Sequence, residues 1–109
     1  MTKERERLSF DDMMDALNNS RRRKLLLALL KNNPQDEAPA VIGDSDSETD
    51  AVELLVSMQH THLPKLEEYG LIEWDKDAHE VMKGPKFDEI RPLLELLENH
   101  QDELPTDWI

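Results

Sequence analysis

The sequence feature that most constrains the fold is the stretch from Ser47 to Ile72, SETDAVELLVSMQHTHLPKLEEYGLI. Ser47, followed three residues later by Asp50, fits the start of a helix, because a serine side chain can accept a hydrogen bond from a backbone N–H of the first turn. Gly70 fits the end of that helix, because glycine adopts the left-handed conformation of a C-terminal cap without steric penalty. We therefore predict one long helix that passes directly into a strand.

Apolar residues in this helix recur every three or four positions and predict one inward-facing stripe. The stripe consists of Val52, Val56 (or Leu55), Gln59, Leu63 and Leu66, with the glutamine as a polar interruption. Pro64 lies inside the helix, where it lacks a donor N–H and crowds the carbonyl of His60. A kinked or loosened turn is therefore expected near His60 and Thr61.

Two shorter helices are predicted before this stretch. Ser9 with Asp12 fits the cap of the first helix, which runs to about Leu17, and its apolar side consists of Phe10, Met13, Met14 and Leu17. Ser20 can cap the second helix, which ends before Pro34, and its core face consists of Leu25, Leu26, Leu29 and Leu30. Residues 34–46 contain two prolines, a glycine and several acids around a short apolar island, which predicts a loop or a stunted helix.

A hairpin and a last helix are predicted after the long helix. Leu71–Asp75 and His79–Lys83 fit two short strands joined by a turn. The last helix covers about Lys86–Gln101, and its apolar stripe consists of Ile90, Leu93, Leu94 and Leu97. The tail after it carries a second group of apolar residues, Leu104, Trp108 and Ile109.

The predicted order of elements is that of a winged helix-turn-helix. We expect a mainly α fold with a small β-hairpin and an additional C-terminal helix, in a chain whose 109 residues suffice for one domain. Residues 1–8 are predicted to be a flexible N-terminus and residues 9–84 the winged-helix domain. Residues 85–109 are predicted to be a C-terminal helix and tail that form a dimerisation element.

Two phrases of the sequence resemble known regulators. ALNNSRRRKLLLALL (residues 16–30) is similar to the opening of ArsR-like winged helix-turn-helix regulators. HLPKLEEYGLIEWD (residues 62–75) is similar to the end of their recognition helix and the start of their wing. With the acid-rich composition, this region also resembles a haloarchaeal family of small, mostly uncharacterised winged-helix proteins. The resemblance covers about residues 10–83 and implies a DNA-binding transcription regulator, although DEAPAVIGDSD (residues 36–46) stands where such proteins usually carry a well-formed helix.

Acidic residues dominate the composition, with 25 acids against 13 bases and a formal net charge of −12. Such acidity is typical either of disorder or of a surface adapted to high salt. The leucine-rich segments favour a folded core, and the spread of acids over every segment favours adaptation to high salt. No apolar run is long enough to span a bilayer and the N-terminus lacks the apolar part of a signal peptide, so a cytoplasmic location is expected.

Residues 1–33 carry a net charge of +3 in this acidic chain, and they contain its one dense cationic run. That run consists of Arg21, Arg22, Arg23 and Lys24. It is predicted to bind DNA phosphates. The alternative is ion pairing with the protein's own acids. The outer face of the long helix is predicted to contact DNA, with an ordinary solvated face as the alternative. It consists of Ser57, Met58, Thr61 and Lys65, with Gln59 and His60 at its edges and Lys76 at the tip of the wing.

A self-complementary apolar patch is predicted to form a homodimer, with packing onto the chain's own core as the alternative. It consists of Met13, Met14, Ile90, Leu93, Leu94, Leu97 and Trp108. No metal site is expected, because His60 and His62 point about 200° apart on a helix, with His62 half-buried and His60 facing solvent. The chain has no cysteine and no recognisable catalytic arrangement, so neither a cofactor nor an enzyme is expected. The alternative function is a winged-helix module that binds a protein partner and not DNA.

Overall fold

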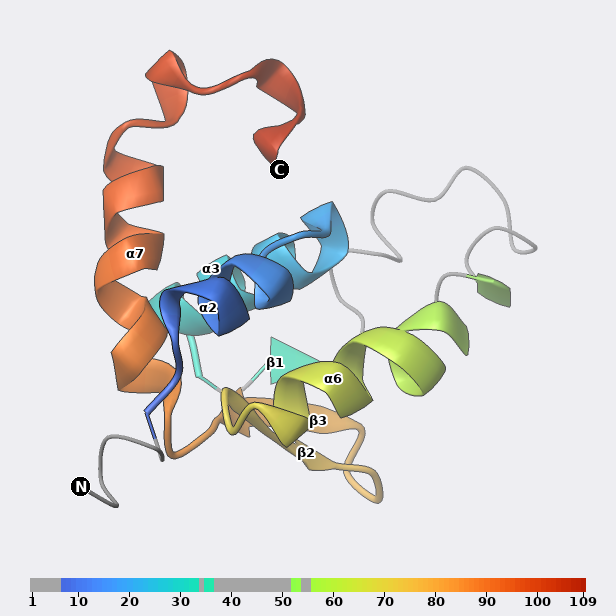
Figure 1. Cartoon of the computed structure of the whole chain (residues 1–109). Helices are drawn as coiled ribbons and strands as arrows, with labels where there is room; N and C mark the ends of the chain where they lie inside the picture. Colours follow the sequence, from blue (N-terminus) through green and yellow to red (C-terminus); the bar gives the residue numbers. More distant parts are fainter. Residues whose placement is uncertain (1–6, 34, 37–51, 54–55) are drawn as a thin grey trace.

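Helices and a three-stranded antiparallel sheet make up the computed structural model, which describes residues 7–33, 35–36, 52–53 and 56–109. In Figure 1, α7 (Phe87–Asn99) and α6 (Leu63–Glu68) lie on opposite sides of α2 (Phe10–Ala16) and α3 (Ser20–Lys31). This is a mainly α, winged-helix-like fold with an additional C-terminal helix, as predicted. Within the described ranges, no helix is both long enough and apolar enough to cross a membrane.

The first helix, α2, begins at the predicted cap. The Ser9 hydroxyl accepts the N–H of Asp12 at 2.9 Å, and the Asp12 carboxylate accepts the N–H of Ser9 at 3.3 Å. The predicted apolar side is only partly correct, because Phe10 is 64 % exposed whereas Ala16 and Leu17 are buried. A helix of seven residues reaches the core mainly with its last turn, so its first turn stays in solvent.

The second helix, α3, carries most of the core leucines. Its N-cap is Asn19, whose side chain accepts the N–H of Arg21 at 2.9 Å, and not Ser20 as predicted. The expected core face is confirmed by the burial of Leu25, Leu26 and Leu29 and by the partial burial of Leu30, while Leu27 is buried as well.

A two-residue strand, β1 (Gln35–Asp36), lies where only a loop or a stunted helix was predicted. It pairs with β3, placing Gln35 opposite Val81 and Asp36 opposite Glu80. So short a strand is defined by its distant partner and not by any local alternation of residues, which explains why the sequence pattern missed it. The remainder of the 34–46 segment, and the predicted helix start at Ser47 and Asp50, lie outside the described residues.

The long helix changes its winding before the proline, as predicted. Residues Met58–His62 form a π-helical segment, η1, and the N–H of Leu63 bonds to the carbonyl of Met58. Pro64 has no N–H to offer the His60 carbonyl, and the wider turn relieves the crowding of its ring against that carbonyl. We call η1 together with α6, residues 58–68, the recognition helix, only because of its place in the chain directly before the wing.

The predicted inward stripe of the long helix is wrong at Val52 and Val56, while Leu55, the alternative to Val56, lies outside the described residues. Val52 is 59 % exposed and Val56 is exposed too, whereas Met58, His62, Leu63 and Leu66 are buried. A π-helical turn holds one more residue than an α-helical turn, which shifts the phase of the buried face relative to a regular helix.

Gly70 ends the recognition helix as predicted, with a φ of +79°. Its N–H bonds to the Glu67 carbonyl at 2.9 Å, and the N–H of Leu71 reaches back to the Leu66 carbonyl at 3.0 Å. These two bonds form a Schellman cap, and the residues that flank it, Leu66 and Leu71, are both buried. The cap turns the chain directly into the wing.

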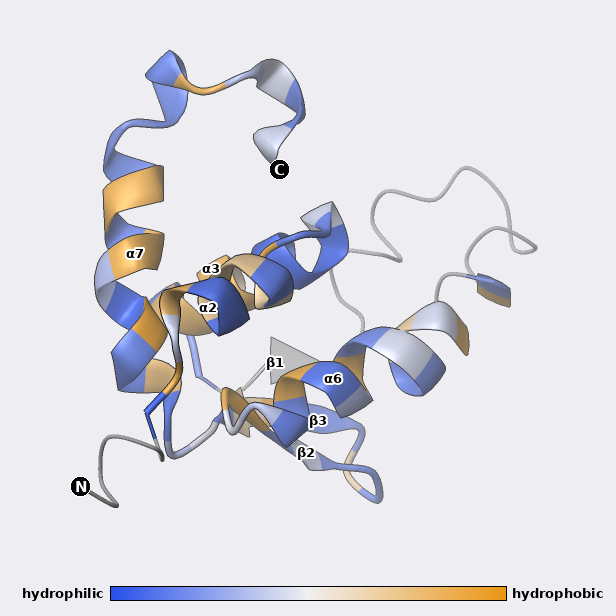
Figure 2. Ribbon diagram, viewed as in Figure 1, coloured by the Kyte–Doolittle hydropathy of each residue, from blue (hydrophilic) through white to orange (hydrophobic). Residues whose placement is uncertain are grey.

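The wing is the predicted hairpin, formed by β2 (Ile72–Asp75) and β3 (Glu80–Lys83). Ile72 and Val81 are its fully buried residues, and the Asp75 carboxylate accepts the N–H groups of Asp77 and Ala78, both at 3.1 Å, to shape the turn. After the wing, α7 alternates between hydrophobic and hydrophilic residues (Figure 2), as an amphipathic helix does. The 3₁₀ turns Gln101–Glu103 and Thr106–Trp108 complete the tail.

Gly84 allows the backbone at the end of the wing to pack closely against the backbone at the end of the recognition helix. A Cβ atom at this position would lie 2.4 Å from the Gly70 carbonyl oxygen and 2.7 Å from the Ile72 nitrogen. The close approach is held by two hydrogen bonds, Gly84 N–H to the Leu71 carbonyl at 2.9 Å and Lys86 N–H to the Gly70 carbonyl at 2.8 Å. Backbone therefore occupies the space that any side chain at residue 84 would need.

Gly84→Ala should lower the free energy of unfolding by about 3 kcal/mol, because backbone must move to admit the methyl group. Gly70→Ala should cost only about 1 to 2 kcal/mol, for its left-handed conformation, because its methyl group meets only the flexible Lys86 side chain. Denaturant unfolding of both variants measures the difference. Equal losses in the two variants would contradict the close backbone approach at Gly84.

Candidate nucleic-acid interface

Arg22, one of the four cations predicted to bind phosphate, is buried at 6 % exposure and bound within the protein. Its guanidinium donates to the carbonyls of Ala16 at 2.8 Å and Asp15 at 3.0 Å, and to Nδ1 of His62 at 2.9 Å. The side chain thus closes the C-terminal end of α2 and binds it to the last residue of η1. Because its donors point inward to these acceptors, Arg22 is not available to DNA, which corrects the prediction.

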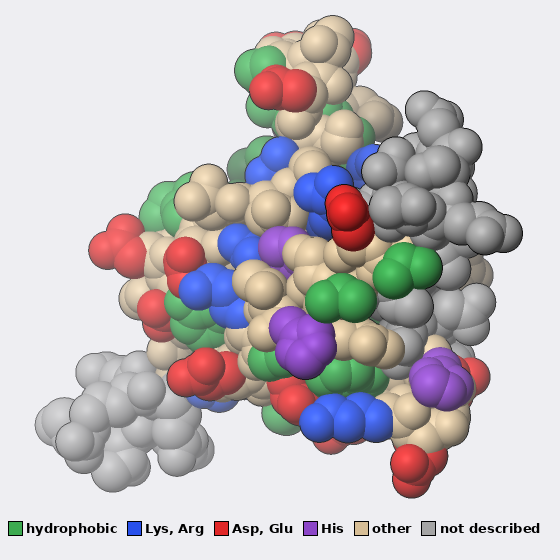
Figure 3. Space-filling view, turned by 90° about the vertical axis from the view of Figure 1, so that its right-hand side faces the viewer, with side chains coloured by type: hydrophobic (Ala, Val, Ile, Leu, Met, Phe, Trp, Pro, Cys, Tyr) green, Lys and Arg blue, Asp and Glu red, His purple; other side chains and the backbone are tan. Residues whose placement is uncertain are grey.

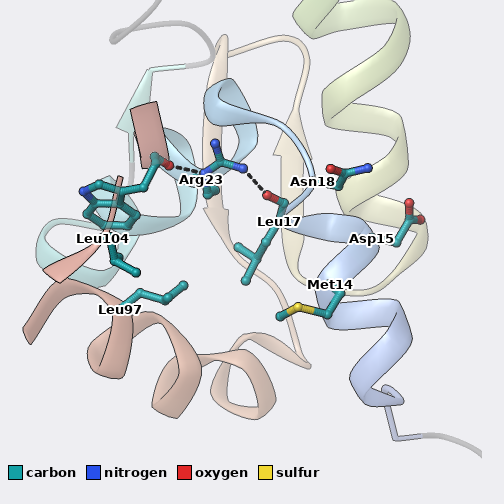
Figure 4. A pocket seen from close by; sticks show the side chains of 8 residues that line it. Met14, Asp15, Leu17, Asn18, Arg23, Leu97 and Leu104 are labelled. Atoms are coloured by element: carbon teal, nitrogen blue, oxygen red, sulfur yellow. Dashed lines mark hydrogen bonds between the residues drawn. The ribbon is translucent and has the colours of Figure 1, made fainter. Parts of the chain in front are cut away.

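Arg23 is also bound within the protein. Its guanidinium donates to the carbonyl of Leu17, after α2, and to the carbonyls of Trp108 and Asp107 in the tail (Figure 4). It therefore holds the tail against the start of α3 and is a poor candidate for a phosphate contact. Lys24 also has an interaction within the protein, while for Arg21, which is half-buried, the described part of the chain shows no ion pair.

Lys65 projects from the recognition helix but is paired with an acid. Its ammonium lies 2.8 Å from the Asp15 carboxylate, which also accepts the Tyr69 hydroxyl at 2.5 Å. The hydrogen bonds from Lys65 and Tyr69 lower the pKa of Asp15, and the Asp15 carboxylate in turn raises the pKa of Tyr69 to about 12. A phosphate that approached Lys65 would have to compete with this pair.

Met58, predicted to face DNA, is instead a core residue at 1 % exposure. The shifted phase of the π-helical turn places it beside His62 on the inner side. The predicted contact residues Ser57 and Gln59 are half-exposed, and His60 and Thr61 are exposed. The outer face of the recognition helix is therefore narrower than predicted.

A groove of about 360 Å³ lies between the recognition helix and the wing. Gln59, His60 and Pro64 line it from the helix, and Trp74, Lys76 and His79 line it from the wing. The Lys76 ammonium lies 4.8 Å from the centre of the Trp74 ring, a cation–π contact that holds the cation over the wing. Among the described residues the groove has no carboxylate in its lining.

Figure 3 shows this side of the molecule, where histidine, basic, apolar and acidic side chains are interspersed. His60 and His79 share the groove although they are far apart in sequence, a pairing that the spacing of the histidines did not reveal. In the ranges that the structure describes, no group of three or more His, Cys, Asp or Glu side chains could hold a metal ion.

The residues predicted to form a dimer interface fall into two groups. Ile90 and Leu94 are buried in the chain's own core, and Met13 and Leu93 pack against it, because α7 applies this face to α3. Leu97 and Trp108 also pack against this core, and with the exposed Met14 they line an open pocket of about 480 Å³ together with Leu17 and Leu104 (Figure 4). Burial thus corrects the predicted interface for Ile90 and Leu94.

The elements and the groove define a winged-helix-like domain with an appended C-terminal helix. Residues 14–82 match a family described as a domain of unknown function (DUF7344), and the chain belongs to this family. Neither a curated protein nor a solved structure matches the chain.

The internal role of Arg22 could have been recognised in the sequence. It lies three, four and seven residues before Leu25, Leu26 and Leu29, which is the spacing of residues on one helix face. An arginine on the leucine-rich face of a helix points toward the core, and a buried guanidinium needs hydrogen-bond acceptors. The identity of those acceptors, two carbonyls of α2 and a histidine 40 residues away, depends on the fold.

Arg22→Met should lower the free energy of unfolding by about 2 to 4 kcal/mol, because it leaves buried carbonyls and His62 without a donor. Arg21→Met, the same change one residue earlier, should alter it by less than about 0.5 kcal/mol. Denaturant unfolding in one buffer compares the two. Similar losses would contradict the structural role of Arg22.

Proposed function

We propose that this protein binds double-stranded DNA as a winged-helix transcription regulator, as a homodimer without a catalytic role or a cofactor. The observation that supports this most is the groove between recognition helix and wing. In a chain with a net charge of −12, the described lining of this groove contains a lysine, two histidines and no carboxylate. The lining itself therefore does not repel a phosphate backbone, although acids lie around it.

The proposed DNA contacts are divided by chemistry. Gln59 and Thr61 can read base edges, since an amide fits adenine and a threonine offers both a hydroxyl and a methyl group. Lys76, Arg21 and His60 can approach phosphates, which position the protein without specifying sequence. Ser57 lies at the start of the same face. Arg22, Arg23 and Met58 are omitted, because the structure uses them internally.

Acids around the groove set the conditions under which DNA could bind. Glu67 and Glu68 on the recognition helix, and Asp75 and Asp77 on the wing, are exposed. Molar salt shortens the range of their repulsion to about 3 Å, but it also weakens each phosphate contact. We therefore propose a protein adapted to a salt-rich cytoplasm that relies on base contacts, shape and the doubled interface of a dimer. The likeness of residues 16–30 and 62–75 to ArsR-like and haloarchaeal regulators supports the same proposal.

The proposed dimer surface comprises the outer side of α2 and the adjoining apolar pocket. Phe10 and Met14 are one helical turn apart and exposed, and Met14 also lines the pocket with Leu97 and Trp108. Two copies related by a two-fold axis would bury these side chains and present two recognition helices to successive half-sites.

The alternative function is binding of a protein partner without DNA. It is favoured by the internal use of Arg22 and Arg23, which removes two of the cations that a nucleic-acid surface would need. The two functions differ in what the groove contacts, so substitutions in the groove distinguish them.

Lys76→Glu and Thr61→Glu should each weaken DNA binding at least about tenfold. Lys76→Glu should also reduce the slope of log affinity against log salt concentration by about one. The matched control is Arg91→Glu on α7, the same change in charge on the other side of the α2–α3 pair from α6, which should change the affinity less than about twofold. The measurement is fluorescence anisotropy in molar potassium chloride with DNA selected from a random pool. Failure to select any DNA across a range of salt would sink the DNA proposal and leave the protein-binding alternative.

Phe10→Asp combined with Met14→Asp should convert a wild-type dimer into a folded monomer, because the new charges would be buried in the interface. Val56→Asp introduces a charge at another exposed apolar position and should leave the dimer intact. Sedimentation equilibrium gives the masses and circular dichroism confirms folding. A wild-type protein that is monomeric at high concentration would refute the proposed dimer.

A further inference from the structure

We propose that the contact between His62 and Arg22 is a proton-sensitive latch on the recognition helix. When the imidazole is neutral, the contact holds η1 against the end of α2; when the imidazole gains a proton, the contact breaks and η1 is released. The inference concerns regulation of the proposed DNA surface, and it rests on the proposed function only where the released turn is expected to change DNA binding.

The hydrogen bond defines the protonation state of His62. A guanidinium has only donor groups, so the Nδ1 atom that lies 2.9 Å from Arg22 must supply a lone pair. His62 is therefore neutral in this structure, with its proton on Nε2. Both partners are buried, the imidazole at 5 % and the guanidinium at 6 % exposure. A proton on Nδ1 would place two donors and two positive charges in contact where water cannot screen them.

The charged groups around His62 offer no compensation for that proton. Arg22 and Arg21 of α3 both act on the ring, and both are cationic. The acid nearest to Arg22 in this network, Asp15 of α2, is bound by Lys65 and Tyr69 of the α6 segment. Burial, followed by the charges of Arg22 and Arg21, holds the pKa of His62 below its ordinary value of 6.5.

The latch acts on the turn that carries the proposed DNA contacts. His62 is the last residue of η1, and the same π-helical turn presents Gln59, His60 and Thr61. A π-helical turn has an α-helical alternative with one residue fewer per turn, and changing between the two rotates the attached side chains about the helix axis. The Arg22 contact favours the π-helical turn, so its loss allows the α-helical turn to be populated.

The direction of the pH effect follows from the lowered pKa. Above pH 6.5 both the folded and the unfolded chains hold His62 neutral, and the contact contributes its full stability. As the pH falls below 6.5, the unfolded chain binds the proton more readily than the folded one, so the free energy of unfolding decreases. The latched form of η1 is therefore the neutral-pH form.

The test uses His62→Asn, whose side-chain oxygen can replace Nδ1 as acceptor but cannot take up a proton in this range. Its matched control is His100→Asn, an exposed histidine after α7 that is not among the described residues lining the groove. Backbone amide shifts of residues 57–66 and the ring signals of all four histidines are followed by NMR from pH 7.5 to 5, and DNA affinity is measured across the same range. In wild type and His100→Asn, the amide shifts should follow the titration of the His62 ring below pH 6.5, and the affinity should fall about tenfold. In His62→Asn the part of both responses that follows this ring should be absent.

Three results would overturn the latch: a His62 ring that titrates at or above its ordinary pH of 6.5, amide shifts that do not follow that ring, or a pH response that persists unchanged in His62→Asn. The first two are read in the wild-type protein, so they remain available if His62→Asn does not fold. If the amide shifts follow His62 but no DNA binds at any pH, the latch is supported and the proposed function has failed.

Discussion

The guanidinium of Arg22 is the interaction on which the arrangement of helices depends. It brings together the open carbonyl end of α2, the body of α3 and the last residue of η1, three segments that are separate in the sequence. A buried cation is tolerated only where its donors are satisfied, and among the described residues no buried side-chain polar atom lacks a partner. An apolar side chain of similar size could fill this space, but it could not select the histidine or orient the carbonyls.

This internal use of charge changes where a nucleic acid could bind. The run from Arg21 to Lys24 is the cationic maximum of the sequence, yet Arg22 and Arg23 bind carbonyls within the protein. The proposed DNA surface is smaller than the one predicted from the sequence and has different chemistry. It consists of the groove with Lys76 held over Trp74 and two histidines nearby, which places base and shape recognition ahead of bulk electrostatic attraction. For a protein of net charge −12, that balance is the one that strong salt would favour.

Features that depend on neighbouring residues could be predicted from the sequence, and those that depend on distant partners could not. The Ser9 capping box, the left-handed Gly70 and the hairpin each use contacts within a few residues, and each is present as predicted. Pro64 predicted the loosened turn, but not the shift of phase that buries Met58 and exposes Val52. The strand β1, the acceptors of Arg22 and the presence of His60 and His79 in one groove all depend on residues that only the complete fold brings together.

The last turn of α2 connects the proposed dimer surface with the recognition helix. Asp15 lines the apolar pocket and also binds Lys65 and Tyr69 of the α6 segment, while the carbonyls of Asp15 and Ala16 accept the guanidinium that holds His62. A partner that packed against Met14 would therefore press on a turn whose other side is bonded to the recognition helix. Because Arg22 is shared, a shift of α2 and a proton on His62 would act on the same contact. The pocket, the guanidinium and the π-helical turn are thus linked by a continuous series of contacts through the last turn of α2.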